Sequence, residues 1–151
     1  ETRVAGTFQY YEAGGVWQVT DVKYRAMKPD DPDNLRKLAE GKTPAYQKLT
    51  AAELAQDGAL LEDSSAELQG LTVESAETLT AKDGTVSLLL DCWQNGETVR
   101  IRTLAAQNVA ETLLPAEAYL HHQVDVKGMI QCGEEGAYLL VFQPEGLMLH
   151  P

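Results

Sequence analysis

Apolar and polar residues alternate along residues 123–132, in the last third of the sequence. Every second position is apolar or small, and these positions share one face of an extended chain: Val124, Val126, Gly128, Ile130 and Cys132. A period of two with one apolar face predicts a half-buried antiparallel strand. The apolar run at residues 137–142 predicts a more deeply buried partner strand, joined to the first through a Gly-Glu-Glu-Gly turn at residues 133–136.

Gly128 lies in the middle of the first of these strands. A glycine inside a strand packs no side chain, and it commonly marks a bulge or a tight bend. A small barrel needs such a bend in order to close, so the pattern favours the closing hairpin of a barrel. The alternative is an ordinary hairpin in another kind of all-β domain.

Three more strands are predicted upstream, at residues 68–79, 85–93 and 97–104. Asn95-Gly96 separates the last two and is a strong hairpin signal, because both positions tolerate a positive φ. Over the last two strands, the alternation places one set of side chains inside the sheet: Val86, Leu88, Leu90, Cys92, Val99 and Ile101. It places another set outside: Ser87, Asp91, Trp93, Thr98, Arg100 and Arg102.

The N-terminal part of the chain predicts a β-hairpin followed by two short helices. The hairpin consists of residues 7–11 and 16–25, and a change of apolar parity near Thr20 and Asp21 predicts a bulge in its second strand. The first helix is predicted over residues 32–40, with Asp31 as its cap and Gly41 as its stop. The acceptor-rich residues 27–34 also suggest a calcium loop, but they lack the EF-hand spacing.

The second predicted helix begins with a specific signature. Thr50 and Glu53 have the spacing of a capping box, and Leu49 and Leu54 have that of the accompanying hydrophobic staple. Gly58 is the predicted stop of this helix. A third short helix is predicted at residues 105–114, before Pro115.

The polar residues 60–67 are the predicted domain boundary, which gives an N-terminal part at residues 1–65 and a barrel at residues 66–151. We expect the N-terminal hairpin and helices to pack on the barrel, because short helices are not stable alone. The overall fold class is mainly β with short helices, or α+β.

The order of elements from residue 68 resembles that of an OB-fold, a five-stranded Greek-key barrel with a helix between its third and fourth strands. The run V-D-V-K-G-M-I at residues 124–130 resembles the fourth strand of that family, and G-A-Y-L-L-V-F at residues 136–142 resembles the fifth. Residues 68–151 most resemble the tRNA-anticodon-like OB domains found in uncharacterised exported bacterial proteins.

The resemblance also implies where a ligand would bind. OB-folds often bind along the outer face of their second and third strands, and this implies four candidates: Trp93, Arg100, Arg102 and Tyr138. The tryptophan could stack on a base or a sugar, and the arginines could hold a phosphate. The alternative is a solvated face on which the arginines pair with Asp91 or Glu97, or a face that the N-terminal helices cover.

Charge argues against a nucleic-acid partner. The chain has 151 residues and a net charge of −11, of which −8 belongs to residues 66–151, where 4 basic side chains face 12 acidic ones. An acidic surface repels phosphate backbones. No apolar run has the roughly 18 residues that a membrane-spanning helix needs.

The sequence offers little that points to catalysis. His121 and His122 are neighbours and point in opposite directions in an extended chain, which disfavours one shared metal ion, and no zinc spacing occurs. No nucleophile or phosphate-binding motif is recognisable. We therefore expect no enzyme activity, no metal and no cofactor.

Cys92 and Cys132 both fall on inward positions of their strands. They are either core residues, since a free cysteine packs as a small hydrophobe, or a disulfide across the barrel of an exported protein. The chain begins at Glu1 rather than at a methionine, so it is either a trimmed chain or a mature product, and any leader or lipid anchor lies outside the given sequence. The low charge density and the two cysteines are compatible with an extracytoplasmic protein that is secreted or lipid-anchored after processing, but they do not require one.

Three functional hypotheses follow. The first is a non-enzymatic, exported interaction module that binds a protein or a small molecule. The second is a binder of single-stranded nucleic acid or oligosaccharide that uses the outer face of the second and third barrel strands. The third is a structural domain of a larger cell-surface assembly.

Overall fold

The computed structural model describes residues 2–4, 7–12, 16–20, 35–37, 39 and 45–150. The chain divides into two compact units, Glu1–Thr43 and Pro44–Pro151. The predicted boundary near residue 65 lies inside the second unit. Residues 45–64 belong with the barrel because β5 (Gln47–Lys48) pairs with a barrel strand and α1 (Ala51–Asp57) contributes Leu54 to the core.

The described part of the first unit is β-structure. β2 (Thr7–Tyr11) and β3 (Val16–Thr20) pair antiparallel, which confirms the predicted hairpin over these residues. Its exposed aromatic face is held together by ring contacts, with Phe8 stacked on Trp17 at a centroid distance of 4.7 Å. Cross-strand aromatic pairs of this kind stabilise a two-stranded sheet, which is marginal in water on its own.

The helix predicted over residues 32–40 is wrong at its centre. Residues 35–37 form β4 (Leu35–Lys37), which pairs antiparallel with β1 (Thr2–Val4). The preference for a helix amounts to only a few tenths of a kcal/mol per residue, and pairing with a second strand overrides it. The predicted cap at Asp31, the stop at Gly41 and the bulge at Asp21 lie outside the described residues, as does the acceptor-rich stretch.

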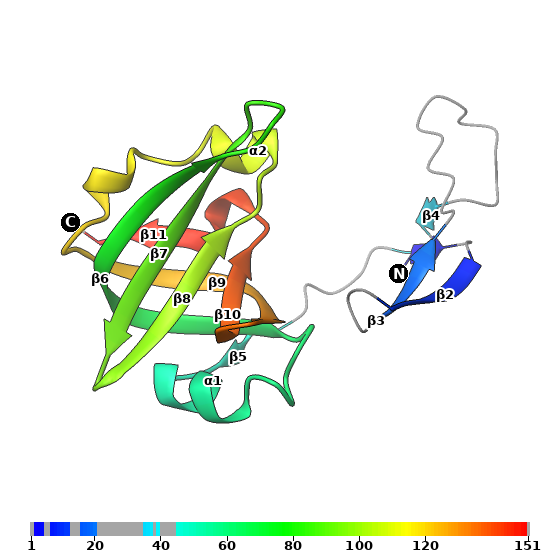
Figure 1. Cartoon of the computed structure of the whole chain (residues 1–151), viewed down its shortest axis with the longest axis horizontal. Helices are drawn as coiled ribbons and strands as arrows, with labels where there is room; N and C mark the ends of the chain where they lie inside the picture. Colours follow the sequence, from blue (N-terminus) through cyan, green and yellow to red (C-terminus); the bar gives the residue numbers. More distant parts are fainter. Residues whose placement is uncertain are drawn as a thin grey trace. The chain divides into compact units, whose positions relative to one another are not determined.

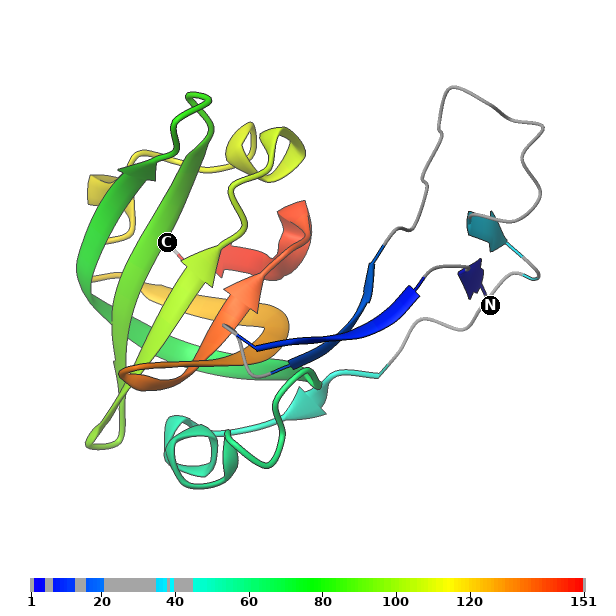
Figure 2. The same cartoon turned by 45° about the vertical axis from the view of Figure 1, so that its right-hand side comes forward.

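The second unit is a closed five-stranded barrel (Figures 1 and 2). Each strand pairs with its neighbour in the order β6-β7-β8-β10-β9, and β9 pairs back onto β6 to complete the ring. The pairing of β10 with β8 is parallel, and the other pairings around the ring are antiparallel. This order and closure are those of an OB-fold. The five strands are β6 (Ser65–Thr80), β7 (Val86–Gln94), β8 (Glu97–Thr103), β9 (Gln123–Gly133) and β10 (Gly136–Val141).

The helices of this unit are short. In α1 the predicted capping box is present: the Thr50 hydroxyl accepts from the Glu53 N–H, and the Glu53 carboxylate accepts from the Thr50 N–H at 2.8 Å. Between β8 and β9, α2 (Gln107–Ala110) is much shorter than the predicted helix, and Ala106 at its N-cap makes no capping hydrogen bond. The remaining elements are η1 (Ala116–Ala118), η2 (Pro144–Gly146) and β11 (Leu147–Leu149), which pairs with β9.

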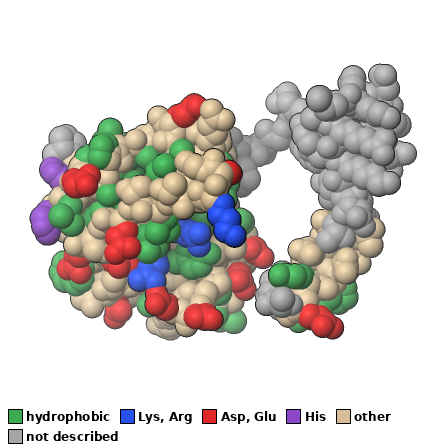
Figure 3. Space-filling view, turned by 45° about the horizontal axis from the view of Figure 1, so that its top comes forward, with side chains coloured by type: hydrophobic (Ala, Val, Ile, Leu, Met, Phe, Trp, Pro, Cys, Tyr) green, Lys and Arg blue, Asp and Glu red, His purple; other side chains and the backbone are tan. Residues whose placement is uncertain are grey.

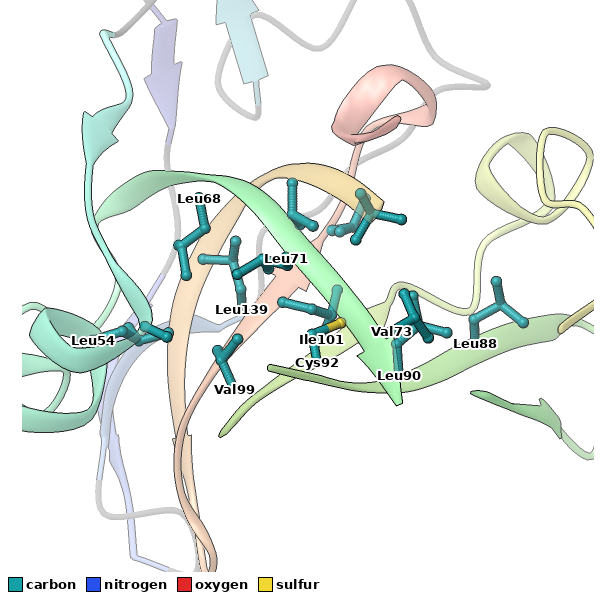
Figure 4. Close-up of a cluster of buried hydrophobic side chains, with 14 of the residues drawn as sticks. Leu54, Leu68, Leu71, Val73, Leu88, Leu90, Cys92, Val99, Ile101 and Leu139 are labelled. Atoms are coloured by element: carbon teal, nitrogen blue, oxygen red, sulfur yellow. The ribbon is translucent and has the colours of Figure 1, made fainter. Parts of the chain in front are cut away.

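Inward-facing aliphatic side chains fill the barrel, and α1 adds Ala51 and Leu54 from outside the sheet; Figure 4 shows Leu54. Five of the six predicted inward positions on β7 and β8 are buried: Leu88, Leu90, Cys92, Val99 and Ile101. The sixth, Val86 at the start of β7, is half-buried. Two predicted positions are wrong. Ser87 was expected outside but is buried at the end of β7, where half-buried Leu79 stands opposite it. Cys132 was expected inside but is exposed, because β9 has run past the last residue that β6 covers.

Position 128 needs a glycine because the backbone of β10 lies too close for a side chain there, and not because its φ is positive. A Cβ added there would stand 2.4 Å from the Leu140 carbonyl oxygen of β10, a distance that real side chains do not tolerate. In the ladder, Gly128 lies opposite Ala66 of β6. The predicted bulge or bend does not appear in the pairing of β9, which runs through Gly128 without a register shift; the glycine is instead needed where β9 packs closely against β10.

Replacing Gly128 with alanine should lower the free energy of unfolding by about 1–3 kcal/mol, because the added methyl must displace the backbone of β10. Urea denaturation followed by circular dichroism measures this. Gly133→Ala is the matched control, since its Cβ would meet only the Tyr138 ring at 3.6 Å and its φ is not positive. Equal stability of the two variants would contradict the role given to Gly128.

Candidate functional site

A groove lies on the outer face of the barrel, between strands β7 and β8 and the loop that joins β9 to β10. Its volume is about 600 Å³. Three of the four residues predicted to bind a ligand line it: Arg100, Arg102 and Tyr138. The rest of the lining combines apolar, hydroxyl and acidic groups from these strands, the loop and the end of β6: Leu79, Leu89, Asp91, Thr98 and residues 133–137.

The register of the sheet explains why these side chains meet. Arg100 lies directly opposite Asp91 of β7 on one side and opposite Tyr138 of β10 on the other. Residues that face each other across neighbouring strands project to the same side of the sheet. Since β10 follows the loop at residues 133–136, its parallel pairing with β8 also brings that loop beside Arg100.

Arg100 joins the sheet to the loop. Its Nε lies 2.9 Å from Asp91 Oδ1, and its Nη1 forms an ion pair with Glu135 in the loop. Asp91 also accepts a hydrogen bond from the Ser75 hydroxyl at 3.0 Å. The sequence left open that the arginines pair with acidic residues across the β7–β8 hairpin and do not bind a ligand. Arg100 does pair with Asp91 in this way. This guanidinium therefore shapes the groove and has no free charge to offer a ligand.

The same contacts fix the charge of Asp91. The hydrogen bond from Arg100 holds the pKa of the Asp91 carboxyl below its usual value, and the Ser75 bond and the Arg100 charge act in the same direction against desolvation. These bonds favour the ionised form, because they are made to the carboxylate oxygens. Asp91 is thus a fixed anion at neutral pH.

Arg102 differs from Arg100. It is exposed and lines the groove, yet it makes no ion pair or side-chain hydrogen bond within the described part of the chain. It lies directly opposite Leu89 of β7 and Leu140 of β10, and both leucines are half-buried. Arg102 is therefore one uncommitted cation of the groove, with a leucine opposite it on each adjacent strand, of which Leu89 also lines the groove.

Trp93 is the predicted residue that the structure leaves out of the groove. It is 43% exposed and lies opposite Thr98, near the end of the β7–β8 hairpin. Sequence reasoning missed the acidic loop and Leu79 as parts of the site. The resemblance to an OB-fold could have predicted the loop. In that fold the fifth strand pairs parallel with the third, so the loop just before the fifth strand, which here precedes Tyr138, lies beside the third strand.

Acidic side chains outnumber basic ones around this groove. Figure 3 shows basic, acidic and hydrophobic side chains interspersed on one face of the barrel. Three carboxylates line the groove against two arginines: Asp91, Glu134 and Glu135. The unit at residues 44–151 carries 5 basic and 16 acidic side chains, so it holds the whole net charge of −11.

The described residues show no group of three or more histidine, cysteine or carboxylate side chains placed to hold a metal ion. His150 pairs instead with Asp125, with 3.1 Å between Nε2 and Oδ1. None of the described helices has the length and apolarity to cross a membrane.

The two cysteines are free and differ in exposure. Cys92 is fully buried in the barrel, and desolvation raises the pKa of its thiol to about 12. Cys132 is exposed at the end of β9, where its backbone N–H donates to the Glu62 carboxylate at 3.2 Å. The structure does not have the disulfide that the sequence left open, because both thiols are free. The other possibility, a cysteine packed in the core, applies to Cys92 but not to Cys132.

No protein-family model matches the chain, and no curated protein matches it. Similar solved structures include a Leishmania major protein described as an aspartyl-tRNA synthetase, at 12% identity over 76% of this chain with a TM-score of 0.49. Others are the asparaginyl-tRNA synthetase of Pyrococcus horikoshii, at 18% over 70% with a TM-score of 0.45, and an SSB domain from Synechococcus sp., at 19% over 56% with a TM-score of 0.42. The chain spans 22% and 23% of the two synthetases and 92% of the SSB domain.

The Arg100–Asp91 pair should make stability depend on pH in acid. Because the folded pKa of Asp91 is lowered, its contribution is complete above the unfolded value of about 3.9 and is lost as pH falls through the folded value. At pH 7, Asp91→Asn should cost up to about 1 kcal/mol, since the pair is partly exposed. Thermal unfolding of both proteins from pH 7 to pH 2 measures the difference, and a constant gap across that range would contradict the assignment.

The two thiols should differ sharply in reactivity. An alkylating reagent at pH 8 should modify Cys132 in the native chain and reach Cys92 only after unfolding, because the buried thiol is both inaccessible and protonated. Mass spectrometry counts the adducts, and Cys132→Ser should abolish native labelling. An intact mass that rises on reduction would reveal a disulfide instead.

Proposed function

We propose that this protein is a non-enzymatic binding module that holds a polypeptide segment of a partner protein in the groove beside β8. The observation that carries the proposal is the groove itself. It brings Arg102 and Tyr138 together with aliphatic side chains in a hollow of about 600 Å³, which lies within the size range of ligand sites.

The mixed lining supports a polypeptide partner. Leu79 and Leu89 offer apolar contact, whereas Thr98 and the Tyr138 hydroxyl can exchange hydrogen bonds with a peptide backbone. A single unpaired guanidinium supplies one charged contact. Tyrosine and arginine are the residue types that most often dominate the binding energy of protein interfaces.

The charge pattern supports this partner over a nucleic acid. Single-stranded nucleic acid is usually held by a positively charged groove that follows its phosphates. Here one arginine is already neutralised by two carboxylates, and Glu134 adds another anion to the lining. Each successive phosphate would meet repulsion, whereas a peptide can place neutral or basic groups beside the same carboxylates.

The state of Asp91 supports a binding role over a catalytic one. General acid catalysis uses carboxyls whose pKa is raised toward neutrality. Asp91 is instead held in its ionised form by Arg100 and Ser75, and both of its oxygens are engaged. The extracytoplasmic location stays a prediction from the sequence alone.

Selection of random displayed peptides on the full chain, followed by titration of the enriched peptides, tests the proposed function. Tyr138→Ala should weaken their binding roughly tenfold, because it removes an aromatic contact from the groove. Lys82→Ala is the matched control, since Lys82 is exposed on the β6–β7 turn and does not line the groove. Enriched peptides that bind the Tyr138 variant unchanged would contradict the proposed site.

An oligonucleotide arm separates the two ligand classes. Oligo(dT) should show no saturable binding even at low salt, where attraction to phosphates is greatest. Saturable binding that falls with salt and is lost in Arg102→Ala would replace the polypeptide with single-stranded nucleic acid.

A further inference from the structure

The two arginines of the groove are unequal, and this inequality points to a kind of ligand. Arg100 is engaged by Asp91 and Glu135, so it adds no net attraction. Arg102, two residues further along the same face of β8, is uncommitted within the described residues. Any anionic group of a ligand is therefore drawn to Arg102 in preference to Arg100.

The neighbours of Arg102 define what should accompany that anion. Leu89 and Leu140 lie directly opposite it on the two adjacent strands. Both are half-buried, and Leu89 also lines the groove. Arg102 is itself exposed, so an ion pair formed there would be partly screened by water. An aliphatic group beside the ligand's anion would add favourable apolar contact with the neighbouring leucine side chain.

The carboxylates of the groove limit the number of anions. Glu134 lines the groove and has no ion-pair partner among the described residues, and Glu135 shares Arg100 with Asp91. A second negative charge on the ligand would meet these groups without a cation to offset them. Like charges placed next to each other at an interface are strongly unfavourable, so a ligand with a second negative charge there would bind much more weakly.

We propose that Arg102 is the specificity-determining residue of the groove, and that it selects a polypeptide segment bearing a single carboxylate next to an aliphatic side chain. This inference rests on the proposed function, because it names the chemistry of the segment that the same groove would hold. The chemistry differs from that of a phosphate backbone, in which every residue of the ligand carries a charge.

Peptide selection on three full-length proteins tests the inference: the wild type, Arg102→Glu and Lys82→Glu. The two variants change the net charge equally, but only the first alters the groove. The wild type and Lys82→Glu should enrich peptides with one Asp or Glu beside Leu, Ile or Val. Arg102→Glu should enrich Lys or Arg at that place and bind the wild-type peptides at least roughly tenfold more weakly.

A pair of probes checks the contact directly. An enriched peptide and its copy with the carboxylate changed to the amide should differ roughly tenfold in affinity for the wild type, but hardly at all for Arg102→Gln. The neutral glutamine also serves where Arg102→Glu folds poorly, and thermal unfolding verifies both variants.

The outcomes separate the two proposals. In one outcome, the enriched peptides lose binding to Tyr138→Ala, which shows that they bind the groove, but they have no preferred carboxylate or bind both Arg102 variants unchanged. This outcome would overturn the role of Arg102 in specificity and leave the binding groove supported. Enriched peptides that tolerate the Tyr138 and Arg102 variants alike would overturn both.

Discussion

Closure of the barrel depends on one long strand that pairs with two others. The first part of β6 pairs with β9 and its later part with β7, and its register shifts between Leu68 and Leu71 and again between Val73 and Ser75. Such irregularities bend and twist a strand. β9 completes the ring because Gly128 allows the β10 backbone to lie close to it. Without this ring, the leucines and valines of the core would face water, and their burial is the main source of stability.

The groove is a consequence of the same topology. Parallel pairing with β8 places Tyr138 opposite Arg100, and the loop that precedes β10 must then lie beside the arginine. The ion pair between Arg100 and Glu135 joins loop and sheet once they are neighbours. Surface ion pairs contribute little to stability, so the value of this contact lies in positioning the loop. Residues distant in the sequence thus share one site because the ring closes.

Patterns within single elements were predictable from the sequence. The alternation of the barrel strands, the Asn95-Gly96 turn and the capping box at Thr50 each depend on residues a few positions apart, and the structure has them. Features set by distant partners were not: Leu35–Lys37 is a strand only because Thr2–Val4 pairs with it. Cys132 lies at an inward-facing position by alternation, but it is exposed because it lies beyond the part of β9 that pairs with β6. Likewise, the parity of Arg100 and Arg102 put both on one face, but only the fold shows which of them is paired.

An acidic barrel with one uncommitted guanidinium can be selective through repulsion as well as attraction. A basic groove attracts any polyanion, and its affinity then depends mainly on the number of phosphates it neutralises. Here the carboxylates beside Arg100 oppose every additional negative charge, so the proposed polypeptide would draw its affinity from one ion pair and from the apolar contacts around it. Specificity is a difference between affinities, and unpaired charges that penalise competitors enlarge it as effectively as new contacts to the preferred partner. The acidity that we expect to disfavour nucleic acid would therefore also help the proposed groove to recognise a polypeptide.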